Sequence, residues 1–254
     1  ILSHIAGQTI VKEKALMVFD EVQLCERALT SLKYFCENAP DYHIIVAGSL
    51  LGVAVNRTKF SFPVGKVDMK TLYPMDMEEF MMALGEDDLV NQIKKCFQTD
   101  TPLPSALHDA AMQLYRQYLV VGGMPECVMQ FAGTKDYILV RHTQDTILAS
   151  YLNDMSKYNT LNEIKKTRLA YDNITVQLSK KNTRFQYKLI KKSGRASEFE
   201  NAIEWLCLSG IVSQVYKVEQ IKKPLENYRD IDAFKIYVSD LGLLCAKKEI
   251  GRAS

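Results

Sequence analysis

Short apolar runs alternate with helical periodicity in the first part of the chain. Ala15–Phe19 and Ile44–Ala47 are continuous apolar runs, which are typical of strands that are covered on both faces. Between them, an apolar stripe at helical spacing predicts a helix that ends near Asn38 and Pro40. A third run, Val67–Leu72, predicts another strand. Strands joined by a crossover helix are expected to be parallel, so their carboxyl ends meet at one edge of a sheet, where ligands bind.

The middle of the chain has the pattern of a helical region. Asp76 and Glu79 have the spacing of a capping box, which predicts the start of a helix. Residues 85–103 are polar and acidic and predict a connection. Residues 105–158 carry two apolar stripes at helical spacing, and the stretch GGMPE at 122–126 interrupts them.

The last part of the chain changes from helical to strand-like patterning. Helices are predicted over residues 163–178, 186–191 and 196–209. The stretches IVSQVYKV and FKIYVSDLG then predict two strands joined by a loop that contains Pro224. Three short helices followed by a β-hairpin is the order of a winged helix, a relative of the helix-turn-helix.

Composition excludes several classes of protein. The 254 residues are 47% hydrophobic and 24% charged, and no apolar run approaches the roughly 18 residues that a membrane span needs. The six cysteines contain no Cys-x-x-Cys pair and the four histidines no His-Glu-x-x-His motif, which argues against a zinc site. The sequence shows no secretory signal, and we therefore expect a cytoplasmic protein with buried, reduced thiols and no membrane partner.

The net charge of +2 is unevenly distributed along the chain. Residues 1–100 carry 10 Lys and Arg against 14 Asp and Glu, whereas residues 156–195 carry 11 against 2. This asymmetry indicates two different roles in two regions.

Two adjacent carboxylates, Asp20 and Glu21, directly follow the first apolar run. An apolar strand followed by Asp-Glu is the pattern of a Walker B motif. In such a motif the Asp holds the water shell of a Mg²⁺ bound to nucleotide phosphates, and the Glu orients or deprotonates the attacking water. The alternative interpretation is a solvated rim of the sheet, where like charges are tolerated in water.

Two further polar residues are candidates for the same site. Ser49 follows the second apolar run, and a small polar side chain there could touch the γ-phosphate or the attacking water, the role called sensor 1. The alternative is a simple strand-to-loop turn at Gly48. Lys66 precedes the third run and could meet phosphate charge, in its own subunit or in a neighbouring one. Its alternative is a solvated surface lysine.

The combined motifs resemble a prokaryotic family of AAA+-like ATPases, in which an ATPase core precedes a domain of unknown function that contains a winged helix. The resemblance spans nearly the whole chain and keeps the motif order of the family. It is carried by LMVFDEVQLCERALTSLKYFCENAP, IIVAGSLLGVA, FPVGKVDMKTLYPMDMEEF, YLVVGGMPECV, ASYLNDMSKY and FKIYVSDLGLL.

The resemblance implies a P-loop fold that uses ATP with Mg²⁺. Self-association is a separate expectation, under which Lys66 would reach a neighbouring subunit. The resemblance also implies Asp20 and Glu21 as Walker B, with Asp20 as the water-mediated Mg²⁺ ligand, and Ser49 as the sensor. Relatives carry Lys or Arg at the position of Lys66. Gln23 also faces the site under this interpretation, or else only opens the following helix.

The expected fold class is therefore α/β plus mainly α, in three domains. Residues 1–84 would be the last part of an ATPase core with a partial parallel sheet, and residues 85–158 a helical connecting region. Residues 159–254 would be a winged-helix-like domain that is truncated at its C-terminus.

One feature of the family is missing from the sequence. The phosphate-binding loop, Gly-x-x-x-x-Gly-Lys-[Ser/Thr], is not found in the 254 residues, so ATP affinity of this chain is expected to be largely lost. We interpret the chain as an internal fragment, cut at both ends, whose sheet is incomplete and under-covered on one face. The alternative is a degenerate homologue that has lost nucleotide binding and acts as a non-catalytic DNA- or protein-binding module.

The basic region suggests a second site. Its cations could neutralise DNA phosphates and would make binding salt dependent. The helix at 196–209, which a winged helix would place in the major groove, carries Glu198, Glu200 and Glu204, so a protein partner is the alternative. Trp205 is expected to pack in the core rather than stack on bases. The candidate nucleic-acid residues are Lys180, Lys181, Arg184, Lys188, Lys191, Lys192 and Arg195.

Overall fold

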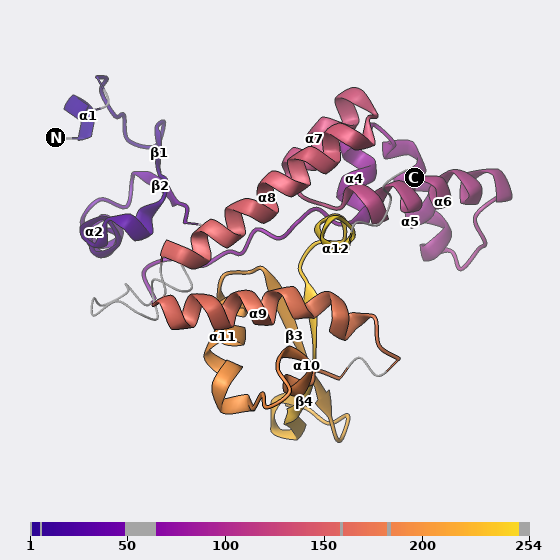
Figure 1. Cartoon of the computed structure of the whole chain (residues 1–254). Helices are drawn as coiled ribbons and strands as arrows, with labels where there is room; N and C mark the ends of the chain where they lie inside the picture. Colours follow the sequence, from indigo (N-terminus) through magenta and orange to yellow (C-terminus); the bar gives the residue numbers. More distant parts are fainter. Residues whose placement is uncertain (1, 6, 49–64, 158–159, 182–183, 249–254) are drawn as a thin grey trace. The chain divides into compact units, whose positions relative to one another are not determined.

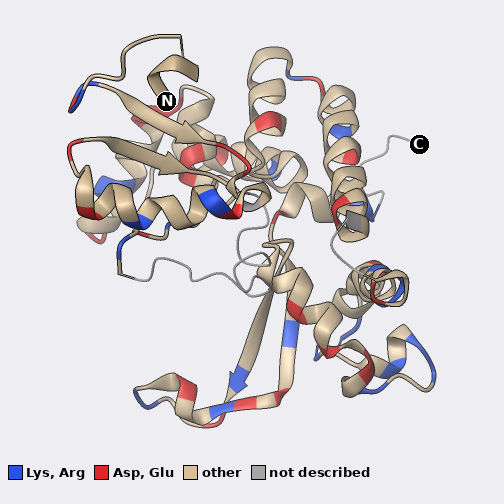
Figure 2. Cartoon of the chain, turned by 90° about the vertical axis from the view of Figure 1, so that its left-hand side faces the viewer, with Lys and Arg blue, Asp and Glu red and all other residues tan. Residues whose placement is uncertain are grey.

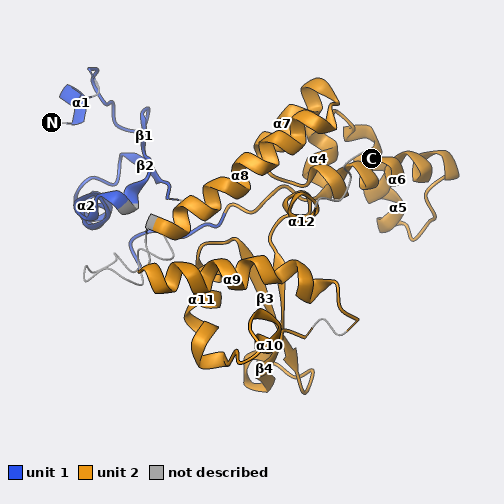
Figure 3. Cartoon of the chain, viewed as in Figure 1, with its two compact units in different colours: residues 1–71 blue, residues 72–254 orange. Residues whose placement is uncertain are grey.

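The computed structural model describes residues 2–5, 7–48, 65–157, 160–181 and 184–248. The chain divides into two compact units, residues 1–71 and residues 72–254 (Figure 3). Within the described residues, unit 1 holds one parallel pair of strands, whereas unit 2 is mostly helical with one antiparallel pair (Figure 1). The fold is therefore a mixed α/β architecture with more helix than sheet.

The elements of unit 1 all precede those of unit 2 along the chain. Unit 1 contains α1 (Leu2–Ile5), β1 (Leu16–Phe19), the 3₁₀ helix η1 (Val22–Leu24), α2 (Glu26–Asn38) and β2 (His43–Val46). Unit 2 begins with α4 (Met77–Ala83), α5 (Asp87–Gln98), α6 (Ser105–Val121), α7 (Pro125–Thr134) and α8 (Tyr137–Lys157). It continues with α9 (Leu161–Leu178), α10 (Tyr187–Ile190), α11 (Ala196–Leu208), β3 (Val212–Val218), η2 (Leu225–Tyr228), β4 (Arg229–Val238) and α12 (Leu241–Lys247).

The sheet of unit 1 is covered by α2 on one face. β1 and β2 pair in parallel, as the crossover helix between them predicts. Val22, Leu29 and Leu32 form the buried cluster between helix and sheet. The other face exposes apolar side chains of both strands: Leu16 is 56%, Val18 59% and Ile45 54% exposed. The expectation of one under-covered face therefore holds for the described residues.

The predicted third strand is wrong. Residues 67–72 have no regular secondary structure, although they are fully described. Val67 packs against the cluster beneath α2. The apolar side chain of Val67 is therefore partly buried against a helix, and Val67 does not belong to a strand that pairs with a neighbour.

The predicted connection at residues 85–103 also needs correction, because most of it is the helix α5. Asp87 and Asp88 lie in its first turn, where the helix dipole favours negative charge. Leu89 and Val90 are buried against α4 and α6. The polar composition that suggested a loop is the solvated face of an amphipathic helix.

Two helix boundaries in unit 2 lie where the sequence predicts them, at the start of α4 and between α6 and α7. Asp76 caps α4, with its carboxylate accepting from the Glu79 amide while the Glu79 side chain accepts from the Asp76 amide, so the capping box is confirmed. Gly122 and Gly123 separate α6 from α7, and Pro125 occupies the first turn of α7. Phe80, Val121, Cys127, Val128, Phe131 and Val140 form the buried cluster that joins α4, α6, α7 and α8.

The last elements are three helices and a hairpin in the predicted order. β3 and β4 pair antiparallel, and β4 starts at Arg229, five residues before the predicted strand. Trp205 on α11 is 3% exposed, which confirms its place in the core. A further helix, α12, follows the hairpin and contacts β4, α6 and α8, so it joins the hairpin to the helical region.

The described residues can be compared with the expectations for membrane spans, metal sites and buried thiols. None of their helices is long and apolar enough to span a membrane. They also contain no group of three or more His, Cys, Asp and Glu side chains that could hold a metal ion. The expectation of buried thiols is correct for Cys127 and wrong for Cys25 and Cys36, which are exposed on and next to α2.

Candidate functional site

The carboxyl edge of the β1–β2 pair is defined by backbone hydrogen bonds that continue beyond the strands. Phe19 lies opposite Val46 in the register. The Ala47 amide donates to the Phe19 carbonyl at 2.9 Å, and the Val22 amide donates to the Ala47 carbonyl at 3.0 Å. Backbone hydrogen bonds to Ala47, directly after β2, thus hold the chain on both sides of the acidic pair. Asp20 and Glu21 consequently lie at the edge where parallel sheets bind ligands.

The acidic pair has a distinctive backbone. Glu21 has φ 50° and ψ 40°, a left-handed conformation that few residues other than glycine adopt. One Asp20 oxygen, Oδ1, accepts a hydrogen bond from the Glu21 amide at 2.9 Å. Both residues are exposed. Residues in such conformations cluster at functional sites, where the surrounding structure holds them in place.

The chain after the acidic pair turns into α2. Val22 is buried and anchors this turn in the cluster with Leu29 and Leu32. Gln23 lies in η1 between Val22 and α2, close in the chain to the acidic pair. Ser49 lies outside the described residues, although Ala47 and Gly48 reach the same edge as Asp20.

Lys66 does not join the acidic pair in this structure. Its Nζ lies 3.2 Å from Oε1 of Glu37, near the C-terminal end of α2. That end lies about 16 Å along the helix axis from Glu26, at about 1.5 Å per residue. Because α2 starts after the carboxyl end of β1 and leads to the start of β2, Glu37 lies toward the opposite edge of the sheet. Lys66 is therefore half-exposed in an ion pair away from Asp20 and Glu21.

The chemistry of the acidic pair fits a magnesium ion. Carboxylate oxygens are the hard ligands that Mg²⁺ prefers, and both side chains are accessible to a hydrated ion. The described residues hold no larger cluster of ligands that could enclose a metal. In proteins, Mg²⁺ usually keeps several waters and is bound through one or two carboxylates together with substrate phosphates.

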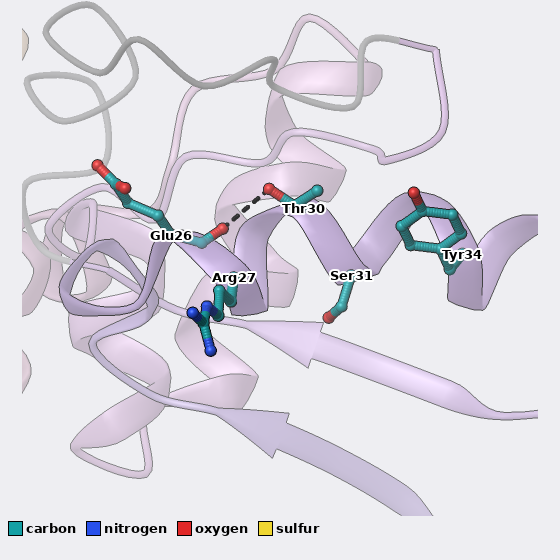
Figure 4. A pocket seen from close by; sticks show the side chains of 5 residues that line it. All are labelled: Glu26, Arg27, Thr30, Ser31 and Tyr34. Carbon is teal, nitrogen blue, oxygen red and sulfur yellow. Dashed lines mark hydrogen bonds between the residues drawn. The ribbon is translucent and has the colours of Figure 1, made fainter.

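An open groove of about 550 Å³ lies on the outer side of α2 (Figure 4). Its lining comes from one helix, and the Thr30 hydroxyl within it donates to the Glu26 carbonyl at 3.0 Å. Among the described residues predicted for the nucleotide site, none lines this groove. The lining residues are Glu26, Arg27, Thr30, Ser31 and Tyr34.

The candidate nucleic-acid residues surround α10 and precede α11, and all seven are at least partly solvent-accessible. Two of them have protein partners: Lys191 pairs with Glu198 at 3.2 Å, and Arg184 donates to the Asp232 carbonyl at 3.0 Å. Lys180 and Lys181 follow α9, Lys188 lies on α10, and Lys192 and Arg195 lie between α10 and α11. Acidic and basic residues alternate on the adjoining β3–β4 hairpin (Figure 2).

The outer face of α11 is acidic. Glu200 and Glu204 are exposed, whereas Phe199, Ile203 and Leu206 are buried on the opposite face. A major groove is lined with base edges between two phosphate backbones, and two exposed carboxylates would repel those backbones. Of the seven cations, Lys191, Lys192 and Arg195 directly precede α11, whereas the exposed face of the helix itself is acidic.

Sequence reasoning missed two features of the carboxyl edge of the β1–β2 pair. The Ala47 carbonyl, which fastens the backbone after Glu21, left no signal because a carbonyl is present at every residue. The left-handed conformation of Glu21 also left none, since glycine is the usual indicator of positive φ.

Comparisons with known proteins found similarities over both parts of the chain. Residues 1–81 match the family described as an AAA domain, and residues 112–254 match a domain of unknown function, DUF8612. A Walker-type ATPase of Pyrococcus abyssi has a similar solved structure, with a TM-score of 0.52 and 13% sequence identity. The similarity covers 92% of this chain and 63% of that one. A comparison with curated proteins gave no match.

Proposed function

The chain belongs to the DUF8612 family and its residues 1–81 match an AAA domain, and from this premise we propose that the intact protein is a P-loop ATPase that binds ATP with Mg²⁺ and hydrolyses it. The observation that carries the proposal is the fastened acidic pair Asp20–Glu21 at the carboxyl edge of a parallel sheet. The chain spans 63% of the length of the archaeal ATPase. A phosphate-binding loop, which the 254 residues do not contain, completes the site in this proposal.

The two carboxylates have separate roles in the proposal. Asp20 and Glu21 would face a Mg²⁺ bound with ATP, and that ion would supply neutralisation of the phosphate charge. Asp20 holds a water of the metal shell through its carboxylate, whose Oδ1 is positioned by the Glu21 amide. Glu21 orients the attacking water and accepts its proton on a carboxylate oxygen.

Gln23, Ser49 and Lys66 have supporting roles in the proposal. Ser49 would contact the γ-phosphate or the water as sensor 1, and Gln23 would face the site from η1. The ion pair of Lys66 with Glu37 favours a role outside its own subunit's site, where the lysine would meet phosphate bound by a neighbouring copy. Such a role requires self-association.

Phosphate release from ATP by the intact protein tests the proposed function. We expect turnover that depends on Mg²⁺ and disappears when the metal is chelated. The 254-residue chain itself is expected to bind MgATP at least about 100-fold more weakly than the intact protein, because the loop amides and lysine are missing. Absence of turnover in the intact protein would contradict the proposal. Micromolar affinity of the shorter chain, measured by calorimetry, would contradict the need for the loop.

A second candidate function is partner binding by a winged helix formed by α9 to β4. The order of three helices and an antiparallel hairpin supports this proposal, and the cations around α10 favour an acidic partner. The acidic outer face of α11 favours a protein over insertion into a DNA major groove. This second function does not require ATPase activity. In a chain without that activity, the sheet of unit 1 would serve only as a scaffold.

Charge reversal on α11 separates DNA from protein binding. We expect Glu200→Lys with Glu204→Lys to increase affinity for a duplex about tenfold or more at low salt. Its log–log salt slope should become steeper by roughly 2, because two phosphate contacts are gained. Asp109→Lys with Asp145→Lys changes the net charge equally on exposed parts of α6 and α8 and serves as the control. A wild-type chain that binds the duplex as tightly as the α11 variant would overturn the protein-partner preference.

A further inference from the structure

The carboxylate of Asp240 lies buried between two helix ends. The residue is 3% exposed and caps α12, with Oδ1 accepting from the Leu243 amide at 2.8 Å. Its other oxygen, Oδ2, accepts from the Gly123 amide at 2.6 Å, in the turn between α6 and α7. A helix cap needs only the first of these bonds. The second bond therefore indicates a role beyond capping.

The same turn holds the segment that opens unit 2. The Met75 amide donates to the Gly123 carbonyl at 2.7 Å. The Tyr118 hydroxyl donates to the Met75 carbonyl at 2.8 Å. Gly123 thus bonds to Asp240 through its amide and to Met75 through its carbonyl. In the chain, residues 72–76 directly follow the end of unit 1.

Three glycines allow these segments to approach one another. A Cβ at Gly123 would overlap the Met75 carbonyl, and one at Gly122 would overlap the Asp240 carboxylate. A Cβ at Gly242 would overlap the Val121 carbonyl. Gly122 also has φ +77°, a conformation that side chains other than glycine adopt at a cost. The packing at this point leaves room for hydrogen atoms only.

Further contacts attach α12 to the helical region. Gln144 on α8 is 1% exposed, and its amide donates to the Val120 and Val121 carbonyls at 2.9 and 3.0 Å. These are carbonyls of the last turn of α6, which lack partners within the helix. The Cys245 thiol on α12 donates to the Leu119 carbonyl at 3.2 Å. Figure 1 shows α12 next to the helices of this region, at the end of β4.

The hydrogen bonds to the buried Asp240 carboxylate depend on one another for electrostatic reasons. Burial raises the pKa of Asp240, and the amides of Gly123 and Leu243 oppose that shift. Burial also raises the pKa of Tyr151 to about 12, with the charge of Asp240 adding to the effect. Among the described residues, the hydrogen-bond donors to this carboxylate are backbone amides rather than Lys or Arg side chains. A buried carboxylate is costly unless its donors stay in place, so the separate segments stabilise one another.

We propose that Asp240 is a positioning residue that locks residues 72–76, the turn at 122–124 and α12 into one joint. If residues 72–76 move, α12 then moves with them, because Gly123 and Asp240 connect the two segments. The transmitted displacement rests on the proposed ATPase function. The joint itself does not.

The Asp240→Ser variant separates the two functions of Asp240, which are to cap α12 through the Leu243 amide and to bind the Gly123 amide. Serine is as good an N-cap as aspartate and keeps the bond to the Leu243 amide, but it is too short to reach Gly123 as well. Amide hydrogen exchange of the full 254-residue chain is the readout, and no nucleotide is needed. The Asp240→Ala variant removes both bonds, and Asp145→Ser changes an exposed residue on α8 as the control.

In Asp240→Ser we expect the amides of Gly123 and Met75 to exchange roughly 10- to 100-fold faster. The buried Gly123 amide loses its acceptor, and the Gly123 carbonyl that binds the Met75 amide is then held less firmly. The Leu243 amide should stay within about threefold of the wild type. In Asp240→Ala all three amides should exchange faster. Unchanged exchange at Met75 and Gly123 in the serine variant would overturn the joint and leave the proposed ATPase function untouched. Equal exchange at Leu243 in the serine and alanine variants would overturn the separation of cap and lock.

Discussion

Glu21→Gln in the intact protein is expected to lower ATP turnover by roughly 10²- to 10⁴-fold, the range that loss of a general base typically costs. ATP binding should change by no more than about threefold, because the glutamine keeps the size of the side chain and Asp20 remains to hold the metal water. Phosphate release and nucleotide titration of the same preparation give both quantities. A large fall in turnover at unchanged binding is the signature of a group that acts in the transition state.

The control for this variant is Glu13→Gln. Glu13 precedes β1 at the other end of the strand, is exposed and also has a left-handed backbone, with φ 59°. The substitution removes the same charge from the same unit, and turnover should stay within about twofold. If Glu21→Gln keeps more than half of the wild-type turnover, Glu21 is not the group that activates water, and the solvated-rim interpretation gains.

Gly123→Ala is expected to destabilise unit 2 by about 3 kcal/mol, at the upper end of the cost of inserting a methyl group into a packed interior. The added Cβ would overlap the Met75 carbonyl and would lie 2.7 Å from the Met75 amide nitrogen. These are backbone atoms, so the clash cannot be relieved by rotating a side chain. Relief requires breaking the bond between the Met75 amide and the Gly123 carbonyl.

Fluorescence in urea measures this effect selectively. Trp205 is the single tryptophan, lies in unit 2 and is 3% exposed, so its emission follows the unfolding of that unit. Gly133→Ala is the matched control, since a Cβ on Gly133 in α7 meets nothing within 4 Å. It should raise stability by up to about 1 kcal/mol through helix propensity. Identical urea midpoints for Gly123→Ala and the wild type would contradict the close approach of the two segments.

The local pattern of the sequence predicted most element positions. The apolar run before Asp20 and the crossover helix are enough to place the acidic pair at a sheet edge, because strand direction follows from connection type. The capping box at Asp76 and the glycines before α7 act within a few residues of chain. Such signals are short-range and can be read without knowing the fold.

The errors have a common physical origin. Residues 67–72 were predicted as a strand from apolar residues, but only Val67 packs against the cluster beneath α2, whereas Met69 is 58% and Leu72 94% exposed. The helix α5 was missed because its charged face dominates a stretch whose buried residues are few. The partner of Lys66 also depends on where the end of α2 lies, which no local pattern encodes.

The sequence by itself determined the acidic pair, its strand, the helix after it and the order of helices and hairpin that follow. Periodicity and turn chemistry act over one or two turns of chain and suffice for these features. Tertiary structure alone decided that Lys66 pairs with Glu37 and that Asp240 lies against Gly123, 117 residues away. Contacts of that kind depend on packing between distant segments, where burial and unsatisfied backbone groups select the partner after the elements have formed.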